Sequence, residues 1–230
     1  MPPTAPVTEL TENISPYSSR HKYRLTPKLT HTFEGEAWLN PREIIVLNII
    51  KQCRTVSSMQ IGRFWTSNKS RQALKRLARW GIIWEHVLEA ERKLNIYTPP
   101  GYIPDPDRAI REMALAELYL KIREIAPCYI KPAQPPLTGI ILYRAVEFNV
   151  LVCRAGDNNA LLPFLLKEIP RLIIIAENID PVFKNLPCRI TTDFALQTLP
   201  LEDAFFKPDG TPSKAKIFAE PIAMLGSKDK

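Results

Sequence analysis

At Gly81 the spacing of apolar residues changes from the period of a helix to that of a strand, and this change constrains the fold most strongly. Before Gly81, apolar residues recur every three or four positions, as on one face of a helix. The predicted helices cover residues 41–53, 59–64 and 68–80. After Gly81, apolar and polar residues alternate, which predicts a hairpin with strands over 82–88 and 93–98. Three short helices followed by a hairpin are typical of a winged helix-turn-helix domain, placed here at residues 38–101.

Residues with strong helix-end preferences stand at the ends of the first and third predicted helices. Asn40 can cap the first helix, and Glu43, three residues later, completes a capping box. Ser67 can cap the third helix, and Gly81 follows it at a position where a left-handed backbone is common. Because these signals agree with the periodicity, we expect the helix boundaries to lie close to them.

The excess positive charge of the chain is concentrated in this predicted domain. The chain has a formal net charge of +7 at pH 7, and residues 40–81 contain nine basic residues and one acidic residue, a net charge of +8. No acidic residue stands between Lys51 and Trp84. Because solvated helix faces usually mix both signs, this run favours a polyanionic partner, most often nucleic acid, over a merely solvated basic surface.

The third predicted helix gathers basic and amide side chains on one face. With Leu74 facing the core, the opposite side carries Asn68, Lys69, Gln72, Lys75, Arg76 and Arg79, with Arg71 at its border. Residues near the start of a recognition helix usually reach the bases, so we expect Asn68, Lys69 and Gln72 to face the major groove. Lys75, Arg76 and Arg79 then suit phosphates. The alternative is an amphipathic helix whose polar face is only solvated.

The predicted hairpin is acidic near its base and basic at its tip. Glu85, Glu89 and Glu91 should repel phosphate. Arg92 and Lys93 are therefore the DNA contacts expected from this element. This charge pattern departs from the simplest arrangement, in which the whole wing lies along DNA.

The second half of the chain predicts a different architecture. Its predicted strands cover residues 140–144, 146–153, 172–176 and 189–192, and its predicted helices cover 108–125, 159–168 and 181–185. This order predicts a small α/β sheet domain over residues 107–200 that serves assembly. The polar ends of the chain predict a flexible arm over 1–37 and a peripheral tail over 201–230. The fold class expected for the whole chain is α+β.

Several protein classes are excluded by what the sequence lacks. It has no apolar run of the roughly 18 residues that cross a membrane, and its first residues lack the features of a secretory signal. We therefore expect a cytoplasmic protein with no membrane partner. The four cysteines are far apart and form no CxxC pair, so free thiols are expected rather than a zinc site. No glycine-rich phosphate loop is present, and no cofactor is expected.

Two parts of the chain resemble a known family. Residues 70–83, together with Ile96-Tyr97-Thr98, are similar to the winged helix of replication-relaxation proteins from plasmids and conjugative elements. Residues 171–177 and 191–193 are similar in layout to the sheet domain that follows it in that family. The resemblance covers roughly residues 40–197. It implies a second domain related to restriction-endonuclease folds and a DNA-associated role in mobile-element maintenance or transfer.

The resemblance raises the alternative of a metal-dependent nuclease. Such an enzyme needs an Asp, followed on the next strand by an acidic-x-Lys sequence, so that carboxylates hold Mg²⁺ and the Lys orients a water molecule. Residues 109–230 contain no such sequence, and Asn149 stands two positions after Glu147 where the Lys would be. The carboxylates that we expect not to form a working metal site are Glu147, Asp157, Glu177 and Asp193. The sheet domain is therefore expected to be a degenerate version of that fold.

The sequence thus predicts a protein without enzymatic activity that binds double-stranded DNA through a basic recognition helix. It would act as a replication, transfer or transcription accessory factor of a mobile element. A homodimer is expected, and other replication or transfer proteins are further candidate partners. The alternatives are the nuclease and a winged-helix module that docks an acidic protein.

Overall fold

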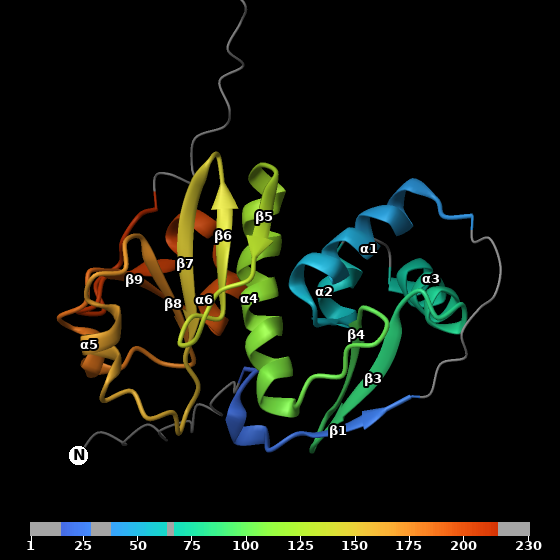
Figure 1. Cartoon of the computed structure of the whole chain (residues 1–230), viewed down its shortest axis with the longest axis horizontal. Helices are drawn as coiled ribbons and strands as arrows, with labels where there is room; N and C mark the ends of the chain where they lie inside the picture. Colours follow the sequence, from blue (N-terminus) through green and yellow to red (C-terminus); the bar gives the residue numbers. More distant parts are fainter. Residues whose placement is uncertain (1–14, 29–37, 64–66, 216–230) are drawn as a thin grey trace, which may run out of the picture.

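The computed structural model describes residues 15–28, 38–63 and 67–215. Within these residues the fold is mixed α+β, with two sheets and six α-helices. Figure 1 shows two lobes side by side, which we call the helix–hairpin lobe (residues 38–101) and the sheet lobe (residues 106–215). The segment 15–28 runs along the lower edge of both lobes in this view.

The helix–hairpin lobe combines three helices with three strands, and a further strand from the segment 15–28 completes its four-stranded antiparallel sheet. Its helices are α1 (Pro41–Cys53), α2 (Ser58–Gly62) and α3 (Ser67–Arg79). Its sheet has the order β1-β3-β4-β2, formed by β1 (Arg24–Pro27), β3 (Trp84–Glu89), β4 (Lys93–Thr98) and β2 (Val56–Ser57). The three predicted helices and the predicted hairpin are confirmed, with small shifts at their ends.

Local capping explains where these helices begin and end. Asn40 accepts a hydrogen bond from the backbone N–H of Glu43 at 3.0 Å, and the Glu43 carboxylate accepts one from the N–H of Asn40 at 3.0 Å. Ser57 and Gln60 form the same reciprocal pair at the start of α2. Gly81, which follows α3, has a φ of 64°. The predicted capping box and the left-handed glycine are therefore present.

The sheet lobe is built on a six-stranded mixed sheet of order β10-β9-β8-β7-β6-β5. Its strands are β5 (Cys128–Lys131), β6 (Gly139–Tyr143), β7 (Val146–Val152), β8 (Leu172–Ala176), β9 (Cys188–Thr192) and β10 (Phe205–Phe206). Strands β7, β8 and β9 run parallel, and the outer pairs are antiparallel. The helical elements of this lobe are α4 (Pro106–Ile125), α5 (Leu162–Leu166), α6 (Asp193–Thr198), η2 (Pro181–Phe183) and η3 (Leu201–Asp203), and η1 (Ser19–His21) lies in the segment 15–28. No helix in the described part of the chain is long and apolar enough to cross a membrane.

Two apolar layers cover the two faces of this sheet. On one face, Val150 and Ile175 pack into the core that contains α4 and α6. On the other face, Leu151 and Ile174 pack against Leu166 of α5. The alternation along β7 places successive side chains in different layers, as expected for a strand that is buried on both sides.

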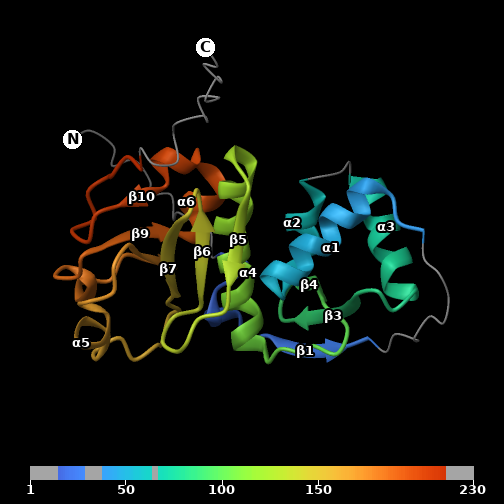
Figure 2. The same ribbon diagram turned by 45° about the horizontal axis from the view of Figure 1, so that its top comes forward.

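Helix α4 lies between the lobes and packs against both of them (Figures 1 and 2). Ile49 of α1, Met113 of α4 and Ile141 of β6 belong to one continuous apolar core. The Gln60 side chain of α2 donates a hydrogen bond to the backbone carbonyl of Met113 at 2.8 Å. The orientation of the helix–hairpin lobe is therefore fixed by packing against the sheet lobe.

Residues 15–28 differ from the predicted flexible arm. Tyr17 is 2% exposed and belongs to the continuous core. Strand β1 pairs with β3 along the outer edge of the hairpin, with Arg24 opposite Glu89. This segment is ordered because it binds residues that are far away in the sequence. Its polar composition gives no sign of these contacts. The remainder of the predicted arm, residues 1–14 and 29–37, lies outside the described residues.

The first part of the predicted peripheral tail is packed into the sheet lobe rather than peripheral. Strand β10 pairs with β9, and Phe205 and Ala215 are fully buried. Residues 216–230 lie outside the described residues. The helix predicted over 159–168 is confined to α5, because its amino-terminal part forms turns instead.

Candidate nucleic-acid interface

Helix α3 has a buried apolar face and an exposed polar face. Leu74, Leu77 and Ala78 are at most 3% exposed and pack into the core. The exposed polar side chains, which we call the α3 face, are Lys69, Arg71, Gln72, Lys75, Arg76 and Arg79. The side chain of Asn68, also predicted to face DNA, lies outside the described residues. The structure therefore places the other predicted residues of this helix on one solvent-facing surface.

Most cations of the α3 face have no acidic partner. Within the described residues, no ion pair involves Lys69, Arg71, Lys75 or Arg79. Among the described residues, no carboxylate neutralises these four charges, which are exposed to solvent and mobile counterions. A surface of this kind attracts polyanions and releases the counterions when a polyanion binds.

Arg76 is different, because it pairs with a buried carboxylate. Its guanidinium donates to Oε1 of Glu43, whose side chain is 0% exposed, while the Arg76 side chain is 45% exposed. The guanidinium also lies over the Trp80 ring, 5.2 Å from the ring centroid. Arg76 thereby joins α3 to α1. The predicted phosphate contact thus has a structural partner that the sequence did not reveal.

A hollow of about 700 Å³ separates the start of α1 from α3. Its walls include Arg42 of α1 and Lys69, Gln72 and Arg76 of α3, and none of its lining residues is acidic. The hollow lies beside the amino-terminal half of α3, the part of a recognition helix that usually approaches the bases. The basic surface therefore extends from α3 onto the first turn of α1.

The hairpin places most of its charges in ion pairs. Glu85 accepts from Lys28 at 2.5 Å, and Glu89 accepts from Lys93 at 3.1 Å. A hydrogen bond from Lys93 and its positive charge lower the pKa of Glu89. The expected repulsion of phosphate by these two acids is thus reduced by neighbouring cations. Arg92 at the tip is exposed and has no ion pair in the part of the chain that the structure describes.

The chain matches no family model, no curated protein and no solved structure.

Two of the candidate metal-binding carboxylates lie apart from each other and bind cations of the protein. Glu147 on β7 pairs with Lys131 on β5 at 2.6 Å, where both side chains are 50% exposed. Asp157 receives two hydrogen bonds from Arg111 of α4, at 2.7 and 2.9 Å. Burial would raise the pKa of Asp157, but hydrogen bonds from Arg111 and the Arg154 backbone outweigh it and lower the pKa.

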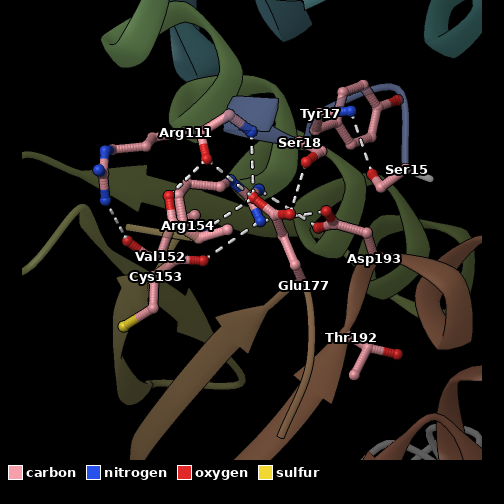
Figure 3. A network of polar contacts seen from close by, with 12 residues as sticks. Ser15, Tyr17, Ser18, Arg111, Val152, Cys153, Arg154, Glu177, Thr192 and Asp193 are labelled. Atoms are coloured by element: carbon pink, nitrogen blue, oxygen red, sulfur yellow. Dashed lines mark hydrogen bonds and ion pairs between the residues drawn. The ribbon is translucent and has the colours of Figure 1, made fainter. Parts of the chain in front are cut away.

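The other two carboxylates, the buried Asp193 and the half-buried Glu177, belong to a set of polar contacts that we call the carboxylate network (Figure 3). Arg154 donates to Asp193 at 3.1 and 3.3 Å, and both side chains are at most 1% exposed. Glu177 accepts from the hydroxyl of Ser18 at 2.5 Å and from the backbone N–H of Ala155 at 3.1 Å. Burial raises the pKa of Asp193 despite the charge of Arg154. The network thus fixes the segment 15–28 to the ends of the parallel strands.

Among the described residues, no group of three or more His, Cys, Asp or Glu side chains is placed to hold a metal ion. Arg111 and Arg154 were not predicted as partners of these acids. Arg154 and Asp193 are 39 residues apart, and no local pattern links them. The four cysteines are free thiols, as predicted, and burial raises the pKa of Cys153 to about 12.

Proposed function

We propose that this protein binds duplex DNA and that its helix–hairpin lobe acts as a winged helix, with α3 as the recognition helix. The observation that carries the proposal is the α3 face, where four exposed cations have no acidic partner among the described residues. A solvated helix face would be expected to mix both signs. The width of the major groove admits a helix of this kind.

The positions along α3 suggest different roles for its residues. Lys69 and Gln72 line the hollow beside α1, in the first half of the helix, and would reach base edges. Lys75 and Arg79 lie further along the helix and would bind phosphates. Arg92, at the exposed hairpin tip, would add a phosphate contact.

The salt dependence of binding tests this proposal. Fluorescence anisotropy with a duplex of about 24 bp, between about 50 and 200 mM salt, should give a log–log slope of about −4 to −5 if four to six phosphates are neutralised. The double substitution Lys75→Ala, Arg79→Ala should weaken binding about tenfold for all sequences, because phosphate contacts carry no sequence information. Lys184 and Lys207 are exposed in the sheet lobe, outside both the α3 face and α5, and their replacement by Ala is the matched control. An affinity that does not change with salt would contradict the proposal.

We further propose that the sheet lobe is a degenerate restriction-endonuclease-like domain that serves assembly in a homodimer. Around α5, Leu161, Phe164 and Leu165 are 63%, 83% and 57% exposed. Lys167 and Glu168 follow directly and are exposed, so that two copies related by a twofold axis could exchange ion pairs around this apolar surface. Phe164→Asp should convert a dimer to a monomer in analytical ultracentrifugation. A wild-type protein that is monomeric at all concentrations would exclude the dimer.

The resemblance to replication-relaxation proteins supports a role in the replication or transfer of a mobile element, with other proteins of that process as partners. A cleavage assay with plasmid DNA distinguishes this proposal from the nuclease alternative. Supercoiled plasmid incubated with the protein and Mg²⁺ should remain intact. Nicking that is abolished by Glu147→Gln would favour the nuclease instead.

A further inference from the structure

Helix α1 connects the α3 face to a second basic region between the lobes. In Figure 2, α1 crosses the front of the helix–hairpin lobe, and its end points toward α4 and β5. The first turn of α1 lines the hollow beside α3. Its last turn lines a cleft of about 630 Å³ between the two lobes, which we call the interlobe cleft.

The interlobe cleft is rich in cations. Those that line it are Lys51, Arg54, Arg108, Arg111 and Lys131. An adjoining hollow of about 490 Å³ shares Lys51, adds Arg123 and has no acidic residue in its walls. Clefts lined by one sign of charge focus the electrostatic potential and concentrate ligands of the opposite sign.

Glu112 is the one acidic residue lining the cleft, and the protein itself satisfies it. Its Oε2 accepts from the Thr55 hydroxyl at 2.6 Å. Its Oε1 accepts from the Tyr102 hydroxyl at 2.5 Å and from Arg108 Nε at 3.1 Å. Because Glu112 is only 6% exposed, it presents little negative charge to a ligand in the cleft.

Lys51 and Arg54 are the cations of the cleft that lack an ion pair in the described residues. Arg108, Arg111 and Lys131 each pair with a carboxylate. Lys51 and Arg54 are both exposed, and the Arg54 guanidinium lies over the Tyr102 ring, 5.6 Å from its centroid. Their charges are therefore available to an anion that enters the cleft.

The backbone of Arg54 adds an independent observation. Arg54 ends α1 with a φ of 63° and a ψ of −47°, in the region that favours glycine. A residue held in such a conformation costs about 1–3 kcal/mol, and such residues cluster at functional sites. The strained backbone presents a guanidinium at the mouth of the cleft, where glycine would present none.

We infer that the interlobe cleft is a second phosphate-binding contact for the same DNA duplex that α3 binds, an inference that rests on the proposed function. The 13 residues of α1 span roughly 20 Å, equivalent to about 6 bp of duplex. The middle of α1 exposes Ile44 and Ile45 rather than charged side chains. The two basic regions are thus separate contacts, and only a duplex that extends past α3 reaches both.

A comparison of two duplex lengths tests this inference. The variant Lys51→Ala, Arg54→Gly removes both unpaired charges, and glycine at position 54 relieves the backbone strain, so the fold is retained. With a duplex of about 24 bp, its affinity should fall about tenfold and its salt slope should become about 2 units shallower. With a hairpin-closed duplex of about 5 bp, which at roughly 17 Å is shorter than α1, its affinity should equal that of the wild type.

Two further variants separate the possible results. Lys184→Ala, Lys207→Ala removes the same number of charges from the sheet lobe and should change neither affinity. If the Lys51–Arg54 variant binds both duplexes like the wild type while Lys75→Ala, Arg79→Ala weakens both, the second contact is overturned and the proposed function stands. If the Lys51–Arg54 variant weakens both duplexes equally, a distinct second contact is also overturned. If the α3 variant changes neither affinity, the proposed function itself fails.

Discussion

The α3 face and the carboxylate network carry charge in opposite ways. On α3, Lys75 and Arg79 are exposed and have no acidic partner among the described residues. In the network, Arg154 and Asp193 are almost completely buried and pair with each other. The first arrangement leaves charge available to a ligand, whereas the second satisfies the charge inside the protein.

This difference determines whether removing a cation affects ligand binding or the stability of the fold. An exposed cation keeps its hydration, so its removal changes the free energy of unfolding little and mainly affects a polyanionic ligand. A buried cation is desolvated, so its removal leaves an uncompensated charge inside the fold. Net charge along the sequence reveals the first kind of site and conceals the second, because paired charges cancel.

The largest expected effect is on the network. Arg154→Ala should lower the free energy of unfolding by about 3–5 kcal/mol, because Asp193 would be buried without its partner. Urea unfolding followed by circular dichroism measures this change. The double variant Arg154→Met, Asp193→Leu removes both charges and should recover most of the loss. A single substitution that costs less than about 1 kcal/mol would show that the buried pair is not coupled in this way.

A smaller effect is expected for Arg76, which lies on the α3 face but, like Arg154, pairs with a buried carboxylate. Arg76→Ala should lower the free energy of unfolding by about 2 kcal/mol, since it leaves the buried Glu43 carboxylate without its cation. Lys75→Ala, at the neighbouring exposed position, is the matched control and should stay within about 0.5 kcal/mol of the wild type. Equal stabilities of the two variants would contradict the division between the two kinds of cation.

The smallest expected effect is on the free energy of unfolding at acidic pH. The pKa of Asp157 is lowered in the folded protein, so its ion pair with Arg111 stabilises the fold above the unfolded-state pKa of about 3.9, and this stabilisation is lost as the pH falls through the folded value. Asp157→Asn should therefore cost about 1 kcal/mol at pH 7 and progressively less as the pH falls toward about 3. Urea unfolding at several pH values measures the difference. A constant difference at every pH would exclude this titration as its cause.

Much of the helix–hairpin lobe could be predicted because its determinants are local. Asn40 and Glu43 are three residues apart, and Gly81 directly follows the helix that it ends. The strands β1, β5 and β10 were not predicted. Strand β1 forms by pairing with β3, far along the chain, and β5 and β10 are short strands at the two edges of the sheet. Apolar periodicity within a short window carries no information on such pairing.

The candidate interface shows the same limit. Helical spacing was sufficient to place Lys75 and Arg79 on an exposed face. It could not distinguish them from Arg76, because the partner of Arg76 is 33 residues earlier in the chain. The interlobe cleft was not predicted at all, since Lys51 and Arg108 meet only when the lobes pack together.

The anchoring of the segment 15–28 has a consequence for how the chain folds during its synthesis. Ser18 binds Glu177, 159 residues later, and Tyr17 binds Glu117, 100 residues later. A ribosome releases residues 15–28 before either of these partners, because Glu117 and Glu177 are synthesised about 100 and 159 residues later. Contacts over such separations are slow to form, because a long loop must close first. Residues 15–28 are thus synthesised before their partners and are among the last described residues to reach their final position.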